Sequence, residues 1–248
     1  MSSLENPGDE DASRSGCTPV SPAEAEKLAA EIAFLKKKLQ IVGSVTRHDV
    51  LNQLTAVVGY NELLGLMVGD EKMKSFLSKE RQAVDKIRRL FQFAKDYQNI
   101  AAEPPRWQNV SDVVHGVSEE SDPGTIRITV LTGDLAILAD PLFDKVLVQL
   151  FGNTVTHGST ATEIRISFQE TGPHALLIVE DNGTGIPPGD KEKIFERGYG
   201  KGTGWGLFLA REILAVTGIT IAENGEPGNG ARFVLTLPRG TYRSGGAK

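Results

Sequence analysis

Cysteine, aromatic residues and long apolar runs are all scarce in this sequence. Of its 248 residues, Cys17 is the only cysteine and 6% are aromatic. A single cysteine excludes a disulfide scaffold and a multi-cysteine metal site. No apolar run approaches the roughly 20 residues that a membrane helix needs, and the N-terminus lacks the basic-then-apolar pattern of a signal peptide. We therefore expect a soluble, cytoplasmic protein.

A concentrated positive charge is also missing. The chain carries 27 basic and 32 acidic side chains, a net charge of -5, and no long basic stripe. This mild acidity gives no electrostatic footprint for nucleic acid. The length suits one or two compact domains, each large enough to bury a core.

The first third of the chain has the pattern of two long helices. Residues 1–21 are small, polar and acidic, which predicts a disordered tail. Apolar residues then recur at steps of four and three, as in a coiled coil, at Leu28, Ile32, Leu35, Leu39 and Val42. A break at Gly69-Asp70 separates this stripe from a second one over 73–94. A helical hairpin over 22–102 has a narrow core, so we expect two copies to pair as a four-helix bundle.

After Glu103-Pro104-Pro105 the composition changes to short alternating strands and helices. Strands are predicted at 107–110, 126–131, 136–139, 164–169, 175–180, 220–223 and 232–237. Helices are predicted at 111–118, 141–156, 190–195 and 205–217. This order predicts an α/β sandwich over 103–240, in which helices cover one face of a mixed sheet, followed by a flexible tail at 241–248.

Two glycine-rich segments carry most of the functional information. Asp181-Asn-Gly-Thr-Gly-Ile-Pro187 follows an apolar strand, which puts a carboxylate at the strand's end beside glycines. Gly202-Thr-Gly-Trp-Gly-Leu207 directly precedes a helical stretch. Glycines allow the backbone to approach a ligand closely, and a helix N-terminus favours a phosphate. Each segment alone is equally consistent with an ordinary turn, whereas the two in this order suggest a nucleotide.

Two polar clusters on the predicted helices contain residues that could act in catalysis or bind a metal ion. A lone helical histidine is ordinarily solvated or packed, but His48 is followed by Asp49 and, one turn later, by Asn52. A carboxylate can keep one imidazole nitrogen protonated and leave the other as a nucleophile, while an amide can position water. Asn153 ends an apolar helical run. Its amide either faces a cleft, where its oxygen can ligate Mg²⁺, or is a capping or hydrogen-bonded core residue.

Together these motifs resemble those of sensor histidine kinases of the two-component type. The resemblance rests on His48-Asp-Val-Leu-Asn52, the segment ending at Asn153, Asp181-x-Gly-x-Gly185, Phe195 and Gly204-x-Gly206-Leu207. It implies an α+β protein, in which a HisKA-like hairpin for dimerisation and histidine phosphotransfer over 22–102 precedes a catalytic domain over 103–240. That domain would be an α/β sandwich of the GHKL (Bergerat) ATPase type.

The resemblance also implies a role for each matching residue. His48 would be the phospho-acceptor, Asp49 the general base and Asn52 the residue that orients water for dephosphorylating the partner. Asn153 would ligate Mg²⁺, and Asp181 would accept the adenine amino group. The other implied nucleotide contacts are Gln149, His157, Gly183, Gly185, Ile186, Lys201, Gly204, Gly206 and Leu207. Lys201 is equally well a solvated loop lysine.

The implied cofactors are ATP and Mg²⁺. The implied partners are a second copy of the chain and the receiver domain of a response regulator, whose aspartate takes the phosphoryl group. The same protein is expected to act as the phosphatase of that partner. His115 and His174 are expected to be structural or exposed.

Three positions depart from the family pattern, and two alternatives stay open. Gln149 stands where an asparagine is common, Thr156 where a basic residue is usual, and Trp205 where a small aliphatic residue is usual. These changes are compatible with slow catalysis or a balance tilted towards phosphatase action. One alternative is a non-catalytic dimeric scaffold with an impaired nucleotide site. The other is a GHKL serine kinase of the anti-sigma type, which would not need His48 on a hairpin.

Overall fold

A computed structural model describes residues 21–121, 126–158, 160–200 and 203–245 of the chain. The chain divides into two compact units, residues 1–45 and 46–248. The predicted disordered tail, apart from Ser21, lies outside the described residues. None of the helices in the described part combines the length and apolar character that crossing a membrane requires.

Two long helices open the described chain, α1 (Pro22–Met67) and α2 (Glu71–Asn99). The first begins as the sequence predicts. The backbone N–H of Ser21 donates to the Glu24 carboxylate and the Glu24 N–H donates to the Ser21 hydroxyl, a reciprocal cap. Hydrogen bonds to the Glu24 carboxylate from the Ser21 hydroxyl and then from the Ser21 backbone N–H lower the pKa of Glu24 below its usual value. Asp70 caps α2 by accepting a hydrogen bond from the Met73 N–H at 2.9 Å.

A buried asparagine aligns the two helices near the hairpin turn. Asn61 donates to the Leu77 carbonyl at 2.9 Å and to the Glu80 carboxylate at 3.2 Å. An exposed ion pair, Arg81 with Glu62 at 2.9 Å, lies beside it. Because a buried amide is costly without partners, this pair of hydrogen bonds favours one register of α2 against α1.

The described residues after α2 form two sheets. The smaller consists of β1 (Arg106–Asn109), β3 (Ala136–Ala139) and β8 (Tyr242–Arg243), in the order β1-β3-β8 and all antiparallel. The sequence pattern predicted the first two strands and a flexible tail from residue 241. In the structure Tyr242 instead pairs with Ile137 and packs against the core.

The larger sheet is mixed, with the order β2-β4-β5-β7-β6. Its strands are β2 (Arg127–Leu131), β4 (Glu163–Glu170), β5 (His174–Asp181), β6 (Thr220–Glu223) and β7 (Arg232–Pro238). Only the β2–β4 pair is parallel, whereas the other pairs are antiparallel. The mixed sheet expected from the turn-rich sequence is therefore present.

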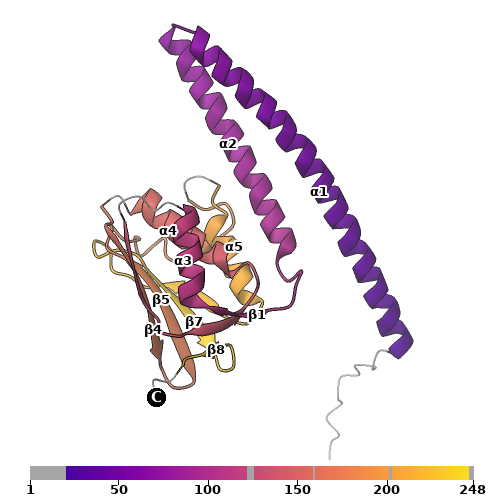
Figure 1. The fold of residues 1–248 in the computed structure, drawn as a ribbon, viewed down its shortest axis with the longest axis vertical. Helices are drawn as coiled ribbons and strands as arrows, with labels where there is room; N and C mark the ends of the chain where they lie inside the picture. The colour runs from indigo at the N-terminus through magenta and orange to yellow at the C-terminus, as the bar shows by residue number, and fades with distance from the viewer. Residues whose placement is uncertain (1–20, 122–125, 159, 201–202, 246–248) are drawn as a thin grey trace, which may run out of the picture. The chain divides into compact units, whose positions relative to one another are not determined.

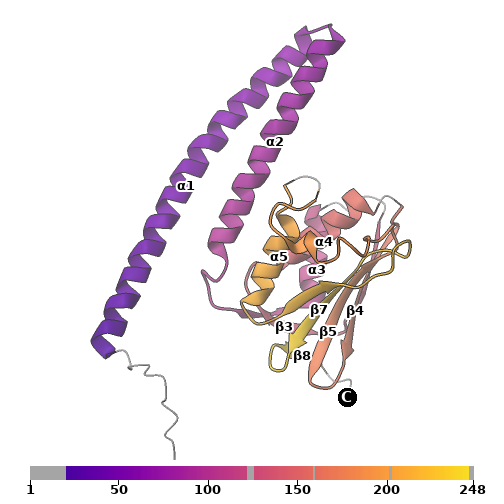
Figure 2. The ribbon, with the colours of Figure 1, turned by 180° about the vertical axis from the view of Figure 1, so that it is seen from behind.

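Three helices lie over one face of this sheet, α3 (Val110–Ser121), α4 (Phe143–His157) and α5 (Gly206–Ala215), as Figures 1 and 2 show from opposite sides. The predicted helix at 190–195 is shorter, a 3₁₀ turn at Lys193–Phe195 named η1. The structure therefore has the expected order of long helices followed by an α/β sandwich.

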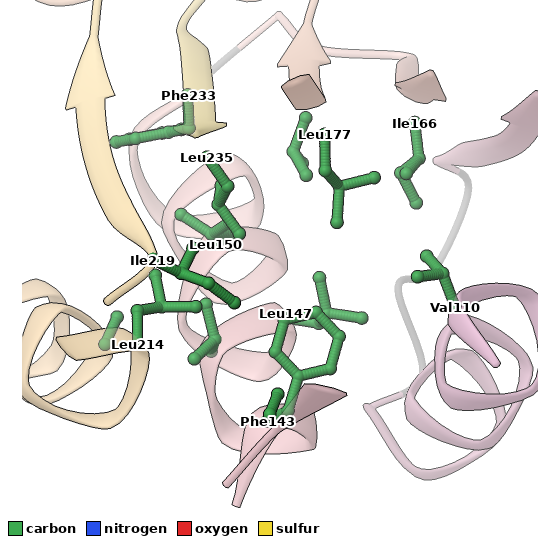
Figure 3. Packing of buried hydrophobic residues seen from close by; sticks show 14 of the residues in the cluster. Val110, Phe143, Leu147, Leu150, Ile166, Leu177, Leu214, Ile219, Phe233 and Leu235 are labelled. Atoms are coloured by element: carbon green, nitrogen blue, oxygen red, sulfur yellow. The ribbon is translucent and has the colours of Figure 1, made fainter. Parts of the chain in front are cut away.

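The core between the helices and the sheet is apolar (Figure 3). Phe143, Leu147, Leu150 and Phe151 of α4 are each at most 1% exposed and pack with side chains such as Leu177 and Leu235 of the sheet. This spacing of four, three and one residues buries one stripe of the helix. The other side of α4 is left less buried, and its polar residues are available for a site.

A buried carboxylate attaches the linker after α2 to the start of α4. Asp140, which is 1% exposed, accepts hydrogen bonds from the N–H groups of Ala101 at 2.8 Å and Leu142 at 2.9 Å. The Gln108 side chain donates to the Asp140 carbonyl at 2.9 Å. Ala101 has a φ of 55°, a conformation that alanine rarely adopts. The hydrogen bond to Asp140 helps to hold it there.

Candidate functional site

A cavity of about 510 Å³ lies between α4, the end of β5 and the start of α5. It gathers most of the residues that the motifs pointed to, although they come from three distant segments. Those that line it are Gln149, Asn153, His157, Asp181, Gly185, Ile186, Gly204, Gly206 and Leu207. The floor and walls include the apolar side chains of Ile194, Leu207 and Phe233. A largely apolar cavity with a few polar groups suits a flat organic base.

Asp181 ends β5 and is held by three hydrogen bonds. Its Oδ1 accepts from the backbone N–H groups of Gly183 at 2.9 Å and Ala231 at 3.1 Å. Its Oδ2 accepts from the Thr154 hydroxyl at 2.8 Å. Because one side chain bonds to the following turn, to the residue before β7 and to α4, its orientation towards the cavity is fixed by the fold. A carboxylate in this setting offers an acceptor to a ligand N–H group.

The turn after Asp181 needs glycine at both motif positions. A Cβ on Gly183 would lie 2.6 Å from the Gly158 carbonyl oxygen at the end of α4. Gly185 has a φ of +70°, and a Cβ there would lie 2.8 Å from the Gly230 carbonyl oxygen. These contacts are too short for a side chain, so the two glycines let the turn pack against α4 and the β6–β7 loop. Gly183 itself packs beside the cavity, whereas Gly185 lines it.

Gly230 makes the tightest backbone approach at the site. Its φ is +94°, and a Cβ would overlap the Asp181 carbonyl oxygen and lie 2.6 Å from the carbonyl carbon. We predict that Gly230→Ala lowers the free energy of unfolding by at least about 3 kcal/mol, because the strand end carrying Asp181 must shift. Urea unfolding followed by circular dichroism measures this loss.

Gly228 provides the matched control for that substitution. It lies in the same loop with a φ of +90°, but a Cβ there would meet no atom within 4 Å. Gly228→Ala should therefore cost only the left-handed backbone strain, about 1–2 kcal/mol. If the two variants lose the same free energy of unfolding, the close approach of Gly230 to Asp181 does not add to the cost of the substitution.

A buried ion pair connects the cavity wall to the β6–β7 loop. The Glu223 side chain is fully buried, and its Oε2 lies 2.9 Å from the Lys191 ammonium. Its Oε1 accepts from the N–H groups of Gly225 at 2.9 Å and Arg232 at 3.1 Å, while Lys191 also donates to the Gly225 carbonyl. This network holds the segment after Gly185 against the loop that supports Asp181.

The less buried side of α4 presents two amides to the cavity. Among the described residues, neither Asn153 nor Gln149 makes a side-chain hydrogen bond, so both amides remain available to a ligand. A Cβ on Gly206 would overlap Oε1 of Gln149, which shows that the longer glutamine arm reaches the start of α5. An amide oxygen beside a phosphate site suits Mg²⁺, which favours hard oxygen ligands. His157 and Thr156 are exposed at the end of α4.

The start of α5 fits an anion. The helix begins at Gly206, and Trp205 at the N-cap position supplies no side-chain hydrogen bond to the first turn. The first N–H groups of a helix have no partner within the helix. Gly204 and Gly206 line the cavity at this end and carry no side chain of their own, and the Gln149 amide lies beside Gly206. The Trp205 ring lies 4.3 Å from the Arg197 guanidinium and 4.3 Å from the Phe93 ring.

A hydrogen bond also links two of the residues that line the cavity. The Tyr199 hydroxyl donates to the Asp190 carboxylate at 2.6 Å, and both residues line the cavity. This hydrogen bond raises the pKa of Tyr199 above its usual value, because it stabilises the protonated phenol beside a negative charge. Lys201, the predicted phosphate contact, lies outside the described residues.

The second polar cluster lies on α1. The His48 ring is exposed, with 75% of its side-chain surface accessible, and its Nδ1 lies 3.3 Å from Asp49 Oδ1. Because the ionised carboxylate can only accept, this contact is a hydrogen bond when Nδ1 carries the proton. Nε2 then keeps its lone pair and lies 3.5 Å from the Asn52 amide nitrogen. The three residues predicted to act together are therefore neighbours on one exposed surface.

Sequence reasoning missed three groups that shape this site. They are Thr154, whose hydroxyl contacts Asp181, the Ala231 N–H, and the Lys191–Glu223 ion pair. Thr154 follows the asparagine motif directly, so its position was visible. Its contact to Asp181 joins residues 27 apart, which no local pattern reveals.

Comparison with known proteins agrees with this geometry. Residues 139–241 match the family described as "Histidine kinase-, DNA gyrase B-, and HSP90-like ATPase". The chain is 31% identical over 241 aligned positions to sensor protein KdpD of Escherichia coli (strain K12), covering 90% of this chain and 27% of that protein. It is 28% identical over 236 positions to sensor protein CitS of Halalkalibacterium halodurans, covering 90% of this chain and 41% of that protein. The chain thus spans less than half the length of these curated relatives.

Solved structures show the same fold. Full-length ShkA in complex with AMPPNP is similar over 83% of this chain and 46% of its own, with a TM-score of 0.57 and 22% identity. The Acinetobacter baumannii histidine kinase AdeS covers 77% of this chain and 97% of its own, with a TM-score of 0.52 and 18% identity.

The fold and the cavity together define the C-terminal part of the chain as a GHKL-type ATPase domain. With the long helices before it and the similarity to sensor proteins over 90% of its length, the chain is of the two-component sensor histidine kinase type. The family resemblance seen in the motifs is confirmed.

Proposed function

We propose that this chain is an ATP-dependent protein histidine kinase that phosphorylates His48 and passes the phosphoryl group to an aspartate of a response-regulator receiver domain. One observation carries the proposal. The asparagine and glycine motifs gather on a single cavity, while the His48 ring is exposed on a separate helix with its Nδ1 beside a carboxylate. A nucleotide site and a nucleophile are the two parts that such a kinase needs.

In the proposed binding mode the adenine lies in the apolar part of the cavity, with its amino group on Asp181. The phosphates would lie at the start of α5, where Gly204 and Gly206 leave the backbone N–H groups open. Mg²⁺, held by the Asn153 amide oxygen and the substrate phosphates, would supply charge neutralisation during phosphoryl transfer. The AMPPNP complex of the structural relative ShkA supports an adenine nucleotide as the guest.

The proposed chemistry uses the two ring nitrogens differently. Nε2 of His48 attacks the γ-phosphorus, a nitrogen–phosphorus bond forms, and the bond between the γ-phosphorus and the bridging oxygen breaks, so that ADP leaves with the electron pair. Asp49 accepts the Nδ1 proton, which removes the positive charge that the ring would otherwise gain. Positioning supplies most of the remaining acceleration in such transfers.

The receiver domain is proposed to dock on the hairpin surface that follows His48. Its aspartate would take the phosphoryl group from the ring as the nitrogen–phosphorus bond breaks. In the reverse role, Asn52 would orient a water molecule that hydrolyses the phosphorylated aspartate. Its amide nitrogen lies 3.3 Å from His48 Nδ1, so it is close to the reacting ring.

We propose that two copies of the chain pair through their long helices. Leu28, Ile32, Leu35, Leu39 and Val42 are each more than half exposed in the single chain, although they form one apolar stripe. An exposed coiled-coil stripe is normally covered by a second helix. Because Arg47 bonds to Gln98 near the end of α2, this stripe lies before the hairpin, where a two-stranded coiled coil would bury it. The two hairpins would pair further along α1 as a four-helix bundle. The cytoplasmic location expected from the sequence stays a prediction.

We further propose that the ATPase domain moves relative to the hairpin at the end of α2. The hydrogen bond from Ala101 to the buried Asp140 attaches the linker to the ATPase domain before Pro104 and Pro105. Rotation at the prolines would break this bond, whereas rotation before Ala101 would preserve it.

The test is incubation of the chain with ATP labelled at the γ-phosphate and Mg²⁺. We predict a phosphoprotein whose label is lost in acid and kept in base, as a phosphohistidine requires, and which passes its label to an added receiver domain. ATP binding without any label would favour the non-catalytic scaffold. An acid-stable label would favour a serine kinase. Either result would contradict the proposed histidine kinase activity.

A further inference from the structure

The hydroxyl of Thr154 has no role in the function proposed above, yet it contacts the carboxylate at the base of the cavity. Thr154 lies on the buried side of α4 and is 6% exposed. Its Oγ1 is 2.8 Å from Asp181 Oδ2 and 3.4 Å from the Leu150 carbonyl oxygen. A hydroxyl has one proton to donate, and the shorter contact is to a charged acceptor, which forms the stronger bond. The Thr154 proton therefore lies on Asp181.

The acceptor positions of Asp181 can then be counted. Oδ1 accepts from two backbone N–H groups, those of Gly183 and Ala231, which occupy its two lone pairs. Oδ2 accepts from Thr154 and keeps one lone pair. Because Asp181 lines the cavity and Thr154 does not, that remaining position is the acceptor available to a ligand.

We propose that Thr154 is a positioning residue that sets base specificity through Asp181, by fixing a single acceptor towards the cavity. This inference rests on the proposed nucleotide-binding function. The acceptor selects a base with an N–H donor at that point, such as the exocyclic amino group of adenine. Guanine has a carbonyl oxygen at the corresponding position, so two acceptors would face each other and both would lose their partners.

Removing the hydroxyl should weaken this selection without removing the cavity. Without Thr154, Oδ2 has two free lone pairs and lacks its bond to α4, so its direction is less restricted. Water can then satisfy the oxygen whether or not the base supplies an amino group. The affinity for a base with an amino group should fall, while the affinity for a base without an amino group should change little.

The experiment compares ATP with purine riboside triphosphate, which lacks the 6-amino group, by calorimetric titration. The unmodified chain should favour ATP by about tenfold or more, in line with one buried hydrogen bond. In Thr154→Val, which keeps the branched shape, we expect ATP affinity to fall by about five- to twentyfold. The affinity for purine riboside triphosphate should stay within about twofold. Thr154→Ser should restore the preference.

Two further variants separate this effect from a loss of structure. Thr156→Val changes an exposed threonine on the same helix and should leave the ratio of affinities unchanged. Thr154→Ala removes the hydroxyl without placing a second methyl group beside Asp181, and should lower the ratio even if valine disturbs folding. Thermal unfolding of each variant measures its structural cost.

The outcomes distinguish a failure of the proposed nucleotide-binding function from a failure of the proposed role of Thr154. No ATP binding by the unmodified chain would overturn the proposed function and this inference with it. ATP binding with an unchanged ratio in Thr154→Val and Thr154→Ala would overturn the role of Thr154 alone. An equal loss of affinity for both nucleotides would do the same, since it would assign Thr154 to packing.

Discussion

His48→Gln abolishes labelling by γ-labelled ATP, lowering the phosphoprotein signal at least about 1,000-fold, while the chain keeps its fold and its affinity for ATP. Glutamine has no nitrogen lone pair that can attack phosphorus, since its amide is not nucleophilic. The His48 side chain is 75% exposed, so its replacement removes little packing. Glutamine is also a good helix former, which preserves α1. Autoradiography after base treatment, with calorimetry for ATP binding, measures both parts of the prediction.

His115 offers the matched control for this variant. It is also a helical histidine beside a carboxylate, with Nε2 3.3 Å from Glu119 and 76% of its side chain exposed. It lies on α3 and outside the cavity. His115→Gln should therefore label as strongly as the unmodified chain. Label that survives in His48→Gln would show that another residue accepts the phosphoryl group.

The parts of this fold that follow local periodicity were predictable from the sequence. Steps of three and four residues placed both long helices, and the break between them at Gly69-Asp70 is where Asp70 caps α2. Short apolar runs between turn residues placed β1 to β7. The two-residue strand β8 was missed, because Tyr242 is ordered by pairing with Ile137, about a hundred residues earlier.

The candidate site was predictable only in part. The residues alone left Asn153 between a cleft ligand and a structural amide, and the family resemblance was needed to choose. The structure brings Asn153, Asp181 and Gly206 to one cavity. Thr154 was not singled out in the sequence, since it continues the buried stripe of α4 and its hydrogen bond depends on how α4 packs on β5. Such long-range pairings follow from the assembled fold.

Asp181→Asn should reduce the affinity for ATP by about a hundredfold and leave the chain folded. The present carboxylate accepts from Gly183, Ala231 and Thr154 and keeps one acceptor for the ligand. An asparagine has one oxygen and one NH₂ group. If its oxygen meets the two backbone N–H groups, its NH₂ faces the Thr154 hydroxyl and the adenine amino group. If it turns over, its NH₂ faces the two backbone donors instead.

Both orientations place donors against donors, and a buried unsatisfied polar group costs about 1–3 kcal/mol. One such group at the adenine contact, together with the lost charge, corresponds to the expected hundredfold loss. Asp134→Asn makes the same change of charge at an exposed position outside the cavity, so it should bind ATP normally. Calorimetric titration measures the affinity of the two variants for ATP. If Asp181→Asn binds ATP as tightly as Asp134→Asn does, the base does not contact the carboxylate at the end of β5, and the proposed orientation of the nucleotide is wrong.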